Sequence, residues 1–397
     1  MMERPYICIA GKNNIAVDVL KYIIEHYGKE DICVVCNKTD TGENGFQRSF
    51  RQFAKLIGVP ERKLEDVYET KNLVFLSLEF DRIVKPWLFS DARLYNIHFS
   101  LLPKYKGMYT SAHPILNGEK YSGVTLHYID AGIDTGDIID QERFDIEDCD
   151  CRALYLRYVE HGTAVVLKNL EDIIWNRTIA EKQKEKESTY YSRSSISYDK
   201  IDIDLNQTAE GVQRQLRAYS FREYQLPEVL GRKIVDSRIL NSRAEGKPGT
   251  VLFQTEDYIV LNTVDYHITL IIDKFSELMT ACTNGDMEMV KKICAYSKNV
   301  INSKDDNGWT PLICATYNNQ IEIVKFLIST GADVNVVNRN GTNLLMYAKE
   351  AYRNNADNTL FKLFSQMGIS ARKRDYKGRD LLSYISEENI TLEELMD

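Results

Sequence analysis

Short apolar runs alternate with helical patterns over the first 80 residues, and this alternation most restricts how the chain can fold. Apolar residues recur at helical spacing between Ala16 and Ile24 and again within residues 50–57. Three runs have the β-branched and aromatic content of buried strands: residues 6–10 (YICIA), 32–36 (ICVVC) and 73–78 (LVFLSL). Strands that alternate with helices predict a doubly wound, Rossmann-like α/β sheet.

A further apolar run ends in two polar side chains, Asn96 and His98. They are two residues apart, so they share one face of an extended strand. Pro103 and Gly107 interrupt strand geometry soon afterwards, which places both side chains where a strand turns into a loop. An amide beside an imidazole can stabilise a developing oxyanion while a proton moves. This stretch is therefore a candidate catalytic centre, and a structural histidine is the alternative.

A second polar loop follows the run GVTLHYI at residues 123–129. Gly132 and Gly136 flank Asp134 there and let the loop turn tightly. An aspartate in a glycine-rich turn usually only forms the turn. In combination with Asn96 and His98, its carboxylate is a candidate to orient the imidazole.

Composition restricts the partners that the chain can have. Fifty-eight acidic and fifty basic residues give a net charge of −8, which disfavours a broad surface for nucleic acid. There is no apolar run of membrane-spanning length and no signal-peptide pattern, so the sequence predicts a cytoplasmic protein that does not bind a membrane. Among the eight cysteines, Cys33 and Cys36 have CxxC spacing, but they fall within a predicted strand and no second CxxC follows, so we expect buried thiols and no metal site.

Several of these segments together resemble the formyltransferases that use N10-formyltetrahydrofolate. The resemblance covers about residues 1–195, and it rests on 96–98 (NIH), 100–103 (SLLP), Gly107, 123–127 (GVTLH) and 132–136 (GIDTG). It implies that Asn96, His98 and Asp134 form a catalytic trio and that N10-formyltetrahydrofolate is the co-substrate, without a metal. Phe99 departs from the pattern, since many members have proline after the histidine.

The same resemblance implies a pterin pocket. Its walls would be Leu78, Phe80 and Ile83 with the loop at residues 128–134, including Asp130. Simple core packing is the alternative for each apolar residue. Lys12 and Asn13 precede the first helix, where free backbone amides could hold a phosphate of the substrate; a plain strand–helix turn is the alternative.

Residues 181–187 form a charged run, which predicts a solvated helix end or linker, and beyond it the chain resembles the longer formyltransferases. Residues 183–195 resemble their connector, and 196–272 would form a small β-rich domain. Four residues resemble a helix end that abuts the acceptor site, where they could meet a nucleotide: Arg217, Tyr219, Phe221 and Tyr224. A hydrophobic plug between domains is the alternative.

A repeat begins after residue 272. The segments 306–312 (DNGWTPL) and 331–335 (GADVN) resemble ankyrin repeats, and Gly341 follows Gly308 at the ankyrin period of about 33 residues. We therefore expect three domains, at 1–195, 196–272 and 273–397, the last all-α. Ankyrin stacks usually bind protein, or this one could form a dimer contact. Trp309 with Asp305 and Tyr317 offers another possibility, a site for a regulatory ligand, although packing of Trp309 between hairpins is the simpler interpretation.

Length and charge separate the acceptors used within this family. A glycinamide ribonucleotide enzyme would end near residue 200, and a methionyl-tRNA enzyme needs a basic surface. A nucleotide-linked amino sugar remains. The resemblance to sugar N-formyltransferases over about residues 1–272, with the aromatic and arginine content of 217–224, implies a dTDP-linked amino-dideoxy sugar, such as dTDP-3-amino-3,6-dideoxyglucose for bacterial surface polysaccharide (lipopolysaccharide O-antigen), and we expect a homodimer. A methionyl-tRNA formyltransferase and an inactive formyltransferase-like ankyrin scaffold stay open as alternatives.

Overall fold

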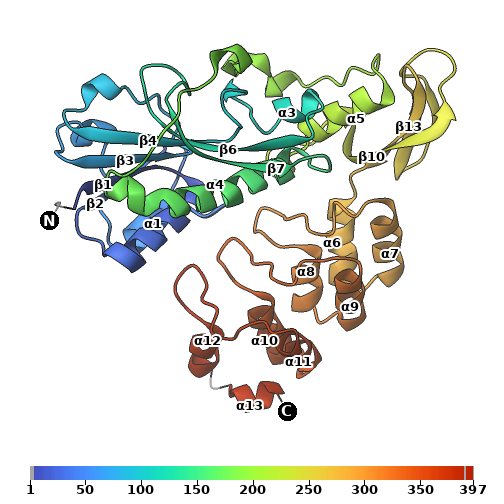
Figure 1. The fold of residues 1–397 in the computed structure, drawn as a ribbon. Helices are drawn as coiled ribbons and strands as arrows, with labels where there is room; N and C mark the ends of the chain where they lie inside the picture. The colour runs from blue at the N-terminus through green and yellow to red at the C-terminus, as the bar shows by residue number, and fades with distance from the viewer. Residues whose placement is uncertain (1–3, 389, 397) are drawn as a thin grey trace. The chain divides into compact units, whose positions relative to one another are not determined.

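The computed structural model describes residues 4–388 and 390–396. The chain divides into two compact units (Figure 1). The first contains the chain up to residue 201 together with 217–221, and the second contains 202–216 and the chain from 222 onward. Among the described residues, no helix has both the length and the apolar character needed to cross a membrane.

A six-stranded mixed sheet forms the centre of the first unit, with strand order β2-β1-β3-β4-β6-β7. The strands are β1 (Tyr6–Gly11), β2 (Ile32–Cys36), β3 (Leu73–Leu78), β4 (Ala92–His98), β6 (Tyr121–Tyr128) and β7 (Ile138–Asp145). The first four run parallel, whereas β6 and β7 are antiparallel to their neighbours. The predicted Rossmann-like α/β class is confirmed, with an antiparallel extension at one edge.

Alternate residues of the strands point to the two faces of this sheet. Ile7 and Ile9 belong to a core that includes residues of the helices α1 (Asn13–Tyr27), α2 (Phe50–Ile57), α3 (His113–Leu116) and α4 (Cys151–Ile174). Figure 1 shows α1 and α4 against the same face. Cys8 and Ala10 face the other side, where they pack with Leu64, Val67 and other residues of a second core. Both faces are covered, which explains why β1, β2 and β3 are mostly apolar along their length.

The register of the sheet gathers polar residues at one strand end. Asn96 on β4 lies beside Ser77 on β3 and opposite His127 on β6, while His98 lies opposite Thr125. The carboxyl end of β4 thus meets the antiparallel strand β6 at two polar positions. Nearby, the two-residue strands β5 (Lys106–Gly107) and β8 (Tyr190–Tyr191) pair in parallel.

The second unit contains a five-stranded sheet of order β11-β12-β13-β10-β9. Its strands are β9 (Glu228–Val229), β10 (Arg232–Arg243), β11 (Val251–Gln254), β12 (Tyr258–Asn262) and β13 (Tyr266–Ile272). Helix α5 (Ala209–Ala218) precedes them in sequence. The predicted β-rich region is confirmed.

Pairs of short helices follow this sheet and confirm the predicted ankyrin repeats. They are α6 (Phe275–Asn284), α7 (Met287–Tyr296), α8 (Pro311–Tyr317), α9 (Ile321–Ser329), α10 (Leu344–Asn355), α11 (Thr359–Gln366), α12 (Leu381–Glu387) and α13 (Leu392–Met396). The Thr310 side chain caps α8 by accepting a hydrogen bond from the Ile313 amide. Successive hairpins are joined by backbone hydrogen bonds, for example from Arg339 N to Asn307 O at 3.2 Å.

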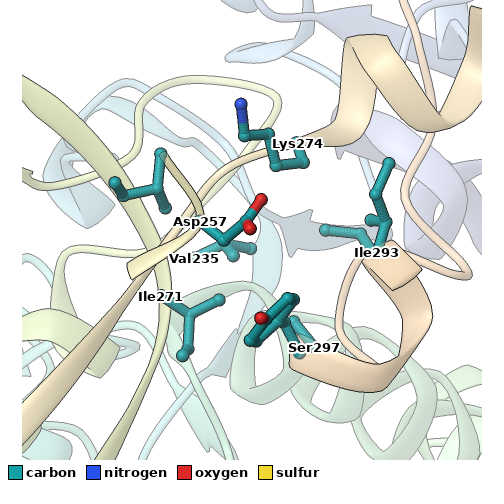
Figure 2. Close-up of a pocket in the computed structure, with 9 residues that line it drawn as sticks. Val235, Asp257, Ile271, Lys274, Ile293 and Ser297 are labelled. Atoms are coloured by element: carbon teal, nitrogen blue, oxygen red, sulfur yellow. The ribbon is translucent and has the colours of Figure 1, made fainter. Parts of the chain in front are cut away.

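The first ankyrin helices pack directly on the small sheet. A cavity of about 10 Å³ between them is lined by residues of β10 and β13 and by α7 with the residues that follow it (Figure 2). That volume holds about one water molecule, so this contact is closely packed. Lys292 Nζ lies 2.9 Å from Asp257 Oδ2, and the rings of Tyr258 and Tyr296 lie 5.7 Å apart. The sheet and the first repeat therefore share one interface.

Candidate active site

Asn96, His98 and Asp134 lie together at the carboxyl end of β4, joined by His127 from β6. His98 Nδ1 lies 3.6 Å and His127 Nε2 lies 3.8 Å from Asp134 Oδ1. Asn96 Nδ2 lies 3.0 Å from His127 Nε2. The two histidines are 8% and 2% exposed, so water competes little for these contacts.

Asp134 is held in a tight loop. Its φ of 55° is in the left-handed region, which aspartate tolerates better than most residues. The Gly107 amide donates a hydrogen bond of 2.9 Å to Asp134 Oδ2. A Cβ on Gly136 would lie 1.8 Å from the carbonyl oxygen of Tyr128, so only glycine fits there. The loop thus leaves Oδ1 turned toward the histidines.

The hydrogen bonds of His98 fix which of its nitrogens faces the carboxylate. His98 Nε2 lies 2.8 Å from the carbonyl oxygen of Tyr105, which can only accept, so Nε2 carries the proton. Nδ1 is therefore the nitrogen that faces Asp134. If Nδ1 is also protonated, the imidazolium forms beside a carboxylate that stabilises it.

His127 was not among the residues predicted for the site, although it belongs to the segment that carries the family resemblance. Its Nδ1 donates to the carbonyl oxygen of Tyr128 at 2.7 Å, so Nε2 is left to accept from Asn96. Burial lowers the pKa of His127 to about 4, and the ring is neutral at pH 7. The neutral ring orients the Asn96 amide, which keeps a second N–H for another acceptor.

The residues predicted for the pterin pocket lie in two different environments. Leu78 is buried in β3, and Phe80 is half-buried with its ring 6.3 Å from that of Phe75. Ile83 is 72% exposed. Asp130 is exposed and accepts hydrogen bonds from the Gly132 amide and the Thr135 hydroxyl. Of the predicted apolar walls, Phe80 and Ile83 are the ones with surface left to contact a ligand.

Lys12 and Asn13 interact with the carboxyl group of Glu79, a half-buried residue that the sequence did not indicate. Asn13 Nδ2 donates to Glu79 Oε2 at 3.3 Å and to the Tyr155 hydroxyl at 2.9 Å. That hydroxyl donates to Glu79 Oε1 at 2.8 Å. Burial raises the pKa of Glu79 to about 7, against the opposing influence of the Lys12 charge.

This pKa predicts a pH-dependent effect of Glu79→Gln on stability. Glu79 stays protonated in the folded chain up to about pH 7 but ionises near 4.5 when unfolded, so it lowers stability progressively across that interval. A shift of this size corresponds to at most about 3 kcal/mol. We expect the unfolding free energy of the glutamine variant, relative to the wild type, to rise by up to this amount from pH 4.5 to pH 8.

Urea unfolding at several pH values measures this difference. Because the lost hydrogen-bond acceptor contributes equally at each pH, only the change with pH reports the ionisation. Stability curves that run parallel for the two proteins from pH 4.5 to pH 8 would show that Glu79 ionises normally in the folded chain.

The four residues predicted to approach the acceptor differ in their burial and in the residues that they contact. The Arg217 guanidinium donates to the carbonyl oxygen of Glu147. The Tyr219 ring lies edge-on to Tyr198, with centroids 6.5 Å apart. Phe221 is buried, with its ring 5.6 Å from that of Tyr155. Tyr224 is 68% exposed and belongs to the second unit.

The predicted accessory residues of the ankyrin region lie together in the second unit. The Trp309 amide donates to Asp305 Oδ1 at 2.8 Å. The indole lies edge-on to Tyr317 and Tyr347, at 5.2 and 5.1 Å between centroids. Trp309 is half-buried and Tyr317 is 38% exposed. The indole therefore packs within an aromatic cluster, and a ligand at its exposed edge stays a prediction.

Within residues 4–388 and 390–396, no three or more His, Cys, Asp or Glu side chains lie close enough together to hold a metal ion. The cysteines are free thiols, and all but the half-buried Cys36 are buried.

The N-terminal and the C-terminal regions of the chain match two different protein families. The model of the formyl transferase family matches residues 59–168, and that of ankyrin repeats matches 260–338 and 278–375. A methionyl-tRNA formyltransferase of Clostridium tetani is 30% identical over 176 residues, which are 43% of this chain and 55% of that protein. The chain thus spans about half the length of this curated relative.

Two solved structures match more completely. An N-formyltransferase from Helicobacter canadensis, in complex with folinic acid and dTDP-3-aminofucose, is 41% identical with a TM-score of 0.64, over 68% of this chain and all of that one. WlaRD, a sugar 3N-formyltransferase in the presence of dTDP and 5-N-formyl-THF, is 40% identical with a TM-score of 0.64, over 69% of this chain and 99% of that one. Matches of this extent and identity show that the chain belongs to the sugar N-formyltransferases.

Proposed function

We propose that the protein transfers a formyl group from N10-formyltetrahydrofolate to the amine of a dTDP-linked 3-amino-dideoxy sugar. The observation that carries the proposal is the arrangement of Asp134, which has one carboxylate oxygen within 4 Å of both His98 and His127 while Asn96 is oriented by His127. Both well-matched structures contain a folate and a dTDP compound, which supports the same two classes of ligand here.

Asn96 supplies the hydrogen bond to the oxyanion in this mechanism. One of its N–H groups is used by His127 at 3.0 Å, and the other is available to the formyl oxygen as negative charge develops there. Because His127 is neutral and accepts, the carboxamide cannot turn its oxygen toward the reacting group without losing this bond. The donor is therefore oriented before the substrate arrives.

His98 and Asp134 move the proton. The attacking amine must lose a proton as its nitrogen bonds to the formyl carbon. In this mechanism the base is the Asp134 carboxylate together with His98, whose Nδ1 lies 3.6 Å from it. Tyr105 keeps the proton on His98 Nε2, so a proton gained at Nδ1 produces an imidazolium next to Asp134. The pair can accept the amine proton and release it to the leaving nitrogen.

The folate supplies an activated formyl group, and the residues near the predicted pocket fit a flat, partly apolar ring. Ile83 is 72% exposed and nearby Trp87 is 65% exposed, although both are strongly apolar. Phe80 is half-buried and packs against the core on one face of the sheet. Exposed apolar side chains that follow a buried strand are suited to cover such a ring.

We further propose a bacterial, cytoplasmic homodimer whose product serves surface polysaccharide such as lipopolysaccharide O-antigen. Lys12 and Asn13, at the start of α1, are candidates to meet the diphosphate. The ankyrin repeats would bind a protein partner or a regulatory ligand. The net charge of −8 favours a nucleotide sugar over RNA as the acceptor.

A panel of acceptors tests the proposal. Purified protein and N10-formyltetrahydrofolate are incubated separately with a dTDP-3-amino sugar, a dTDP-4-amino sugar and methionyl-tRNA, and product is followed by chromatography. We expect turnover with the 3-amino sugar. Preference for methionyl-tRNA would support the function of the curated relatives instead, and no product with any acceptor would support an inactive scaffold.

A further inference from the structure

We propose that residues 181–191, here called the connecting segment, position the catalytic pair through Gln183 and Thr189. The charge of residues 181–187 within it predicts a solvated helix end or linker. The structure places it against both loops that determine how Asp134 faces His98. The inference deepens the proposed function, because it concerns the same reacting groups.

Gln183 holds the loop that carries Asp134. Its Nε2 donates to the carbonyl oxygens of Asp134 and Gly136 at 2.9 and 2.8 Å. Both partners can only accept, so the amide nitrogen must point toward the loop. Its Oε1 is buried and has no hydrogen-bond partner among the described residues, so these two bonds define the position of the side chain.

The same stretch is fixed to the sheet immediately before Gln183. Glu181 exchanges two backbone hydrogen bonds with Ile138, of 2.7 and 2.8 Å, at the start of β7. Gln183 is half-buried, whereas residues 181–182 and 184–190 are exposed. One side chain of the charged run is therefore directed inward while its neighbours are solvated.

Thr189 holds the other loop. Its hydroxyl accepts a hydrogen bond of 2.7 Å from the Tyr105 amide, and its carbonyl oxygen accepts one of 2.9 Å from the Lys106 amide. The carbonyl oxygen of Tyr105 accepts a hydrogen bond from His98 Nε2, and the Gly107 amide donates one to Asp134 Oδ2. Thr189 thus binds the backbone of Tyr105, which orients His98, and of Lys106, which directly precedes the Gly107 that binds Asp134.

Aromatic stacking strengthens this second attachment. The Tyr191 ring stacks on Tyr105 at 5.6 Å and on His113 at 3.7 Å between centroids. The Met108 amide also donates to the carbonyl oxygen of Tyr191 at 2.9 Å. The connecting segment therefore contacts the Asp134 loop at one end and the Tyr105–Met108 loop at the other. A shift of either loop changes the 3.6 Å separation of His98 and Asp134.

Four variants distinguish an effect on the positions of His98 and Asp134 from an effect on the stability of the folded protein. Gln183→Glu places carboxylate oxygens against two carbonyl oxygens, and Thr189→Val removes the acceptor for the Tyr105 amide. Thr189→Ser keeps that acceptor and is the rescue variant. Lys184→Ala changes an exposed neighbour and is the matched control.

We expect Gln183→Glu and Thr189→Val to lower kcat by about 10- to 100-fold with little change in KM, because small displacements of reacting groups have effects of this size. The pH dependence of kcat should shift in both, while Thr189→Ser and Lys184→Ala follow the wild type. Lower thermal stability with unchanged kcat and pH profile would overturn the proposal.

A second readout does not depend on turnover. Labelled histidine and NMR titration follow the six imidazoles, and His98→Gln identifies the His98 signal. We expect the His98 titration to shift in Gln183→Glu and Thr189→Val but not in Lys184→Ala. An unchanged titration in both variants overturns positioning by this segment. A shifted titration without transfer to any acceptor leaves the positioning intact and refutes the proposed function instead.

Discussion

Asp134→Asn should lower kcat/KM for formyl transfer by about 10³-fold, which is within the range for loss of a positioned acid or base. The carboxamide has nearly the same size and can still accept the Gly107 amide through its oxygen. It cannot take a proton, and it does not stabilise an imidazolium at His98, whose Nδ1 lies 3.6 Å away. Steady-state kinetics with the sugar acceptor measure the change.

Asp137→Asn provides the matched control, since Asp137 lies in the same loop and forms a backbone hydrogen bond with Tyr128 that the substitution keeps. We expect it to retain the wild-type rate. His98→Asn should resemble Asp134→Asn, and the double variant should lose little more, because residues that act as a unit are not additive. Full turnover of Asp134→Asn or of His98→Asn would refute the assigned roles.

Asn96→Ala should lower kcat by about 10²- to 10³-fold with KM nearly unchanged, as expected when one donor to an oxyanion is removed. Asn96 is half-buried at the end of β4, so the truncation removes a donor without opening the central core. The kcat and KM values of the purified variant check this expectation.

His127→Leu separates the donor from its orientation. The variant keeps the Asn96 amide but removes the acceptor that holds it at 3.0 Å, and we expect a smaller loss, of about tenfold. For Asn96→Ala, a kcat equal to that of the wild type would mean that groups other than Asn96 stabilise the oxyanion.

The strands β1, β2 and β3 could be predicted from sequence because the side chains on both of their faces are mostly apolar. The strands predicted at residues 32–36 and 73–78 are β2 and β3 of the structure, with the same bounds. The antiparallel pairing of β6 and β7 could not be predicted in the same way, since β7 alternates half-buried and exposed residues along much of its length. Its place at the sheet edge depends on tertiary pairing with β6.

The candidate site could be predicted because polar side chains able to bind or transfer a proton lie close in the sequence to turn-forming residues. Asn96, His98 and Asp134 have that pattern, and the structure brings them together. Glu79 and Gln183 do not have it, because their roles arise from contacts with residues far along the chain, such as Tyr155 and Gly136. A charged residue after a strand and a glutamine within a charged run both resemble solvated positions until the fold is known.

Transfer of a labelled formyl group shows whether the protein formylates the sugar amine and whether this reaction requires Asp134. The protein is incubated with N10-[¹³C]formyltetrahydrofolate and a dTDP-3-amino sugar, and the product is examined by mass spectrometry and NMR, with Asp134→Asn in parallel. We expect one labelled formyl group on the sugar amine with the wild type and almost none with the variant over the same time. An unlabelled sugar, or equal labelling by the two proteins, would contradict it.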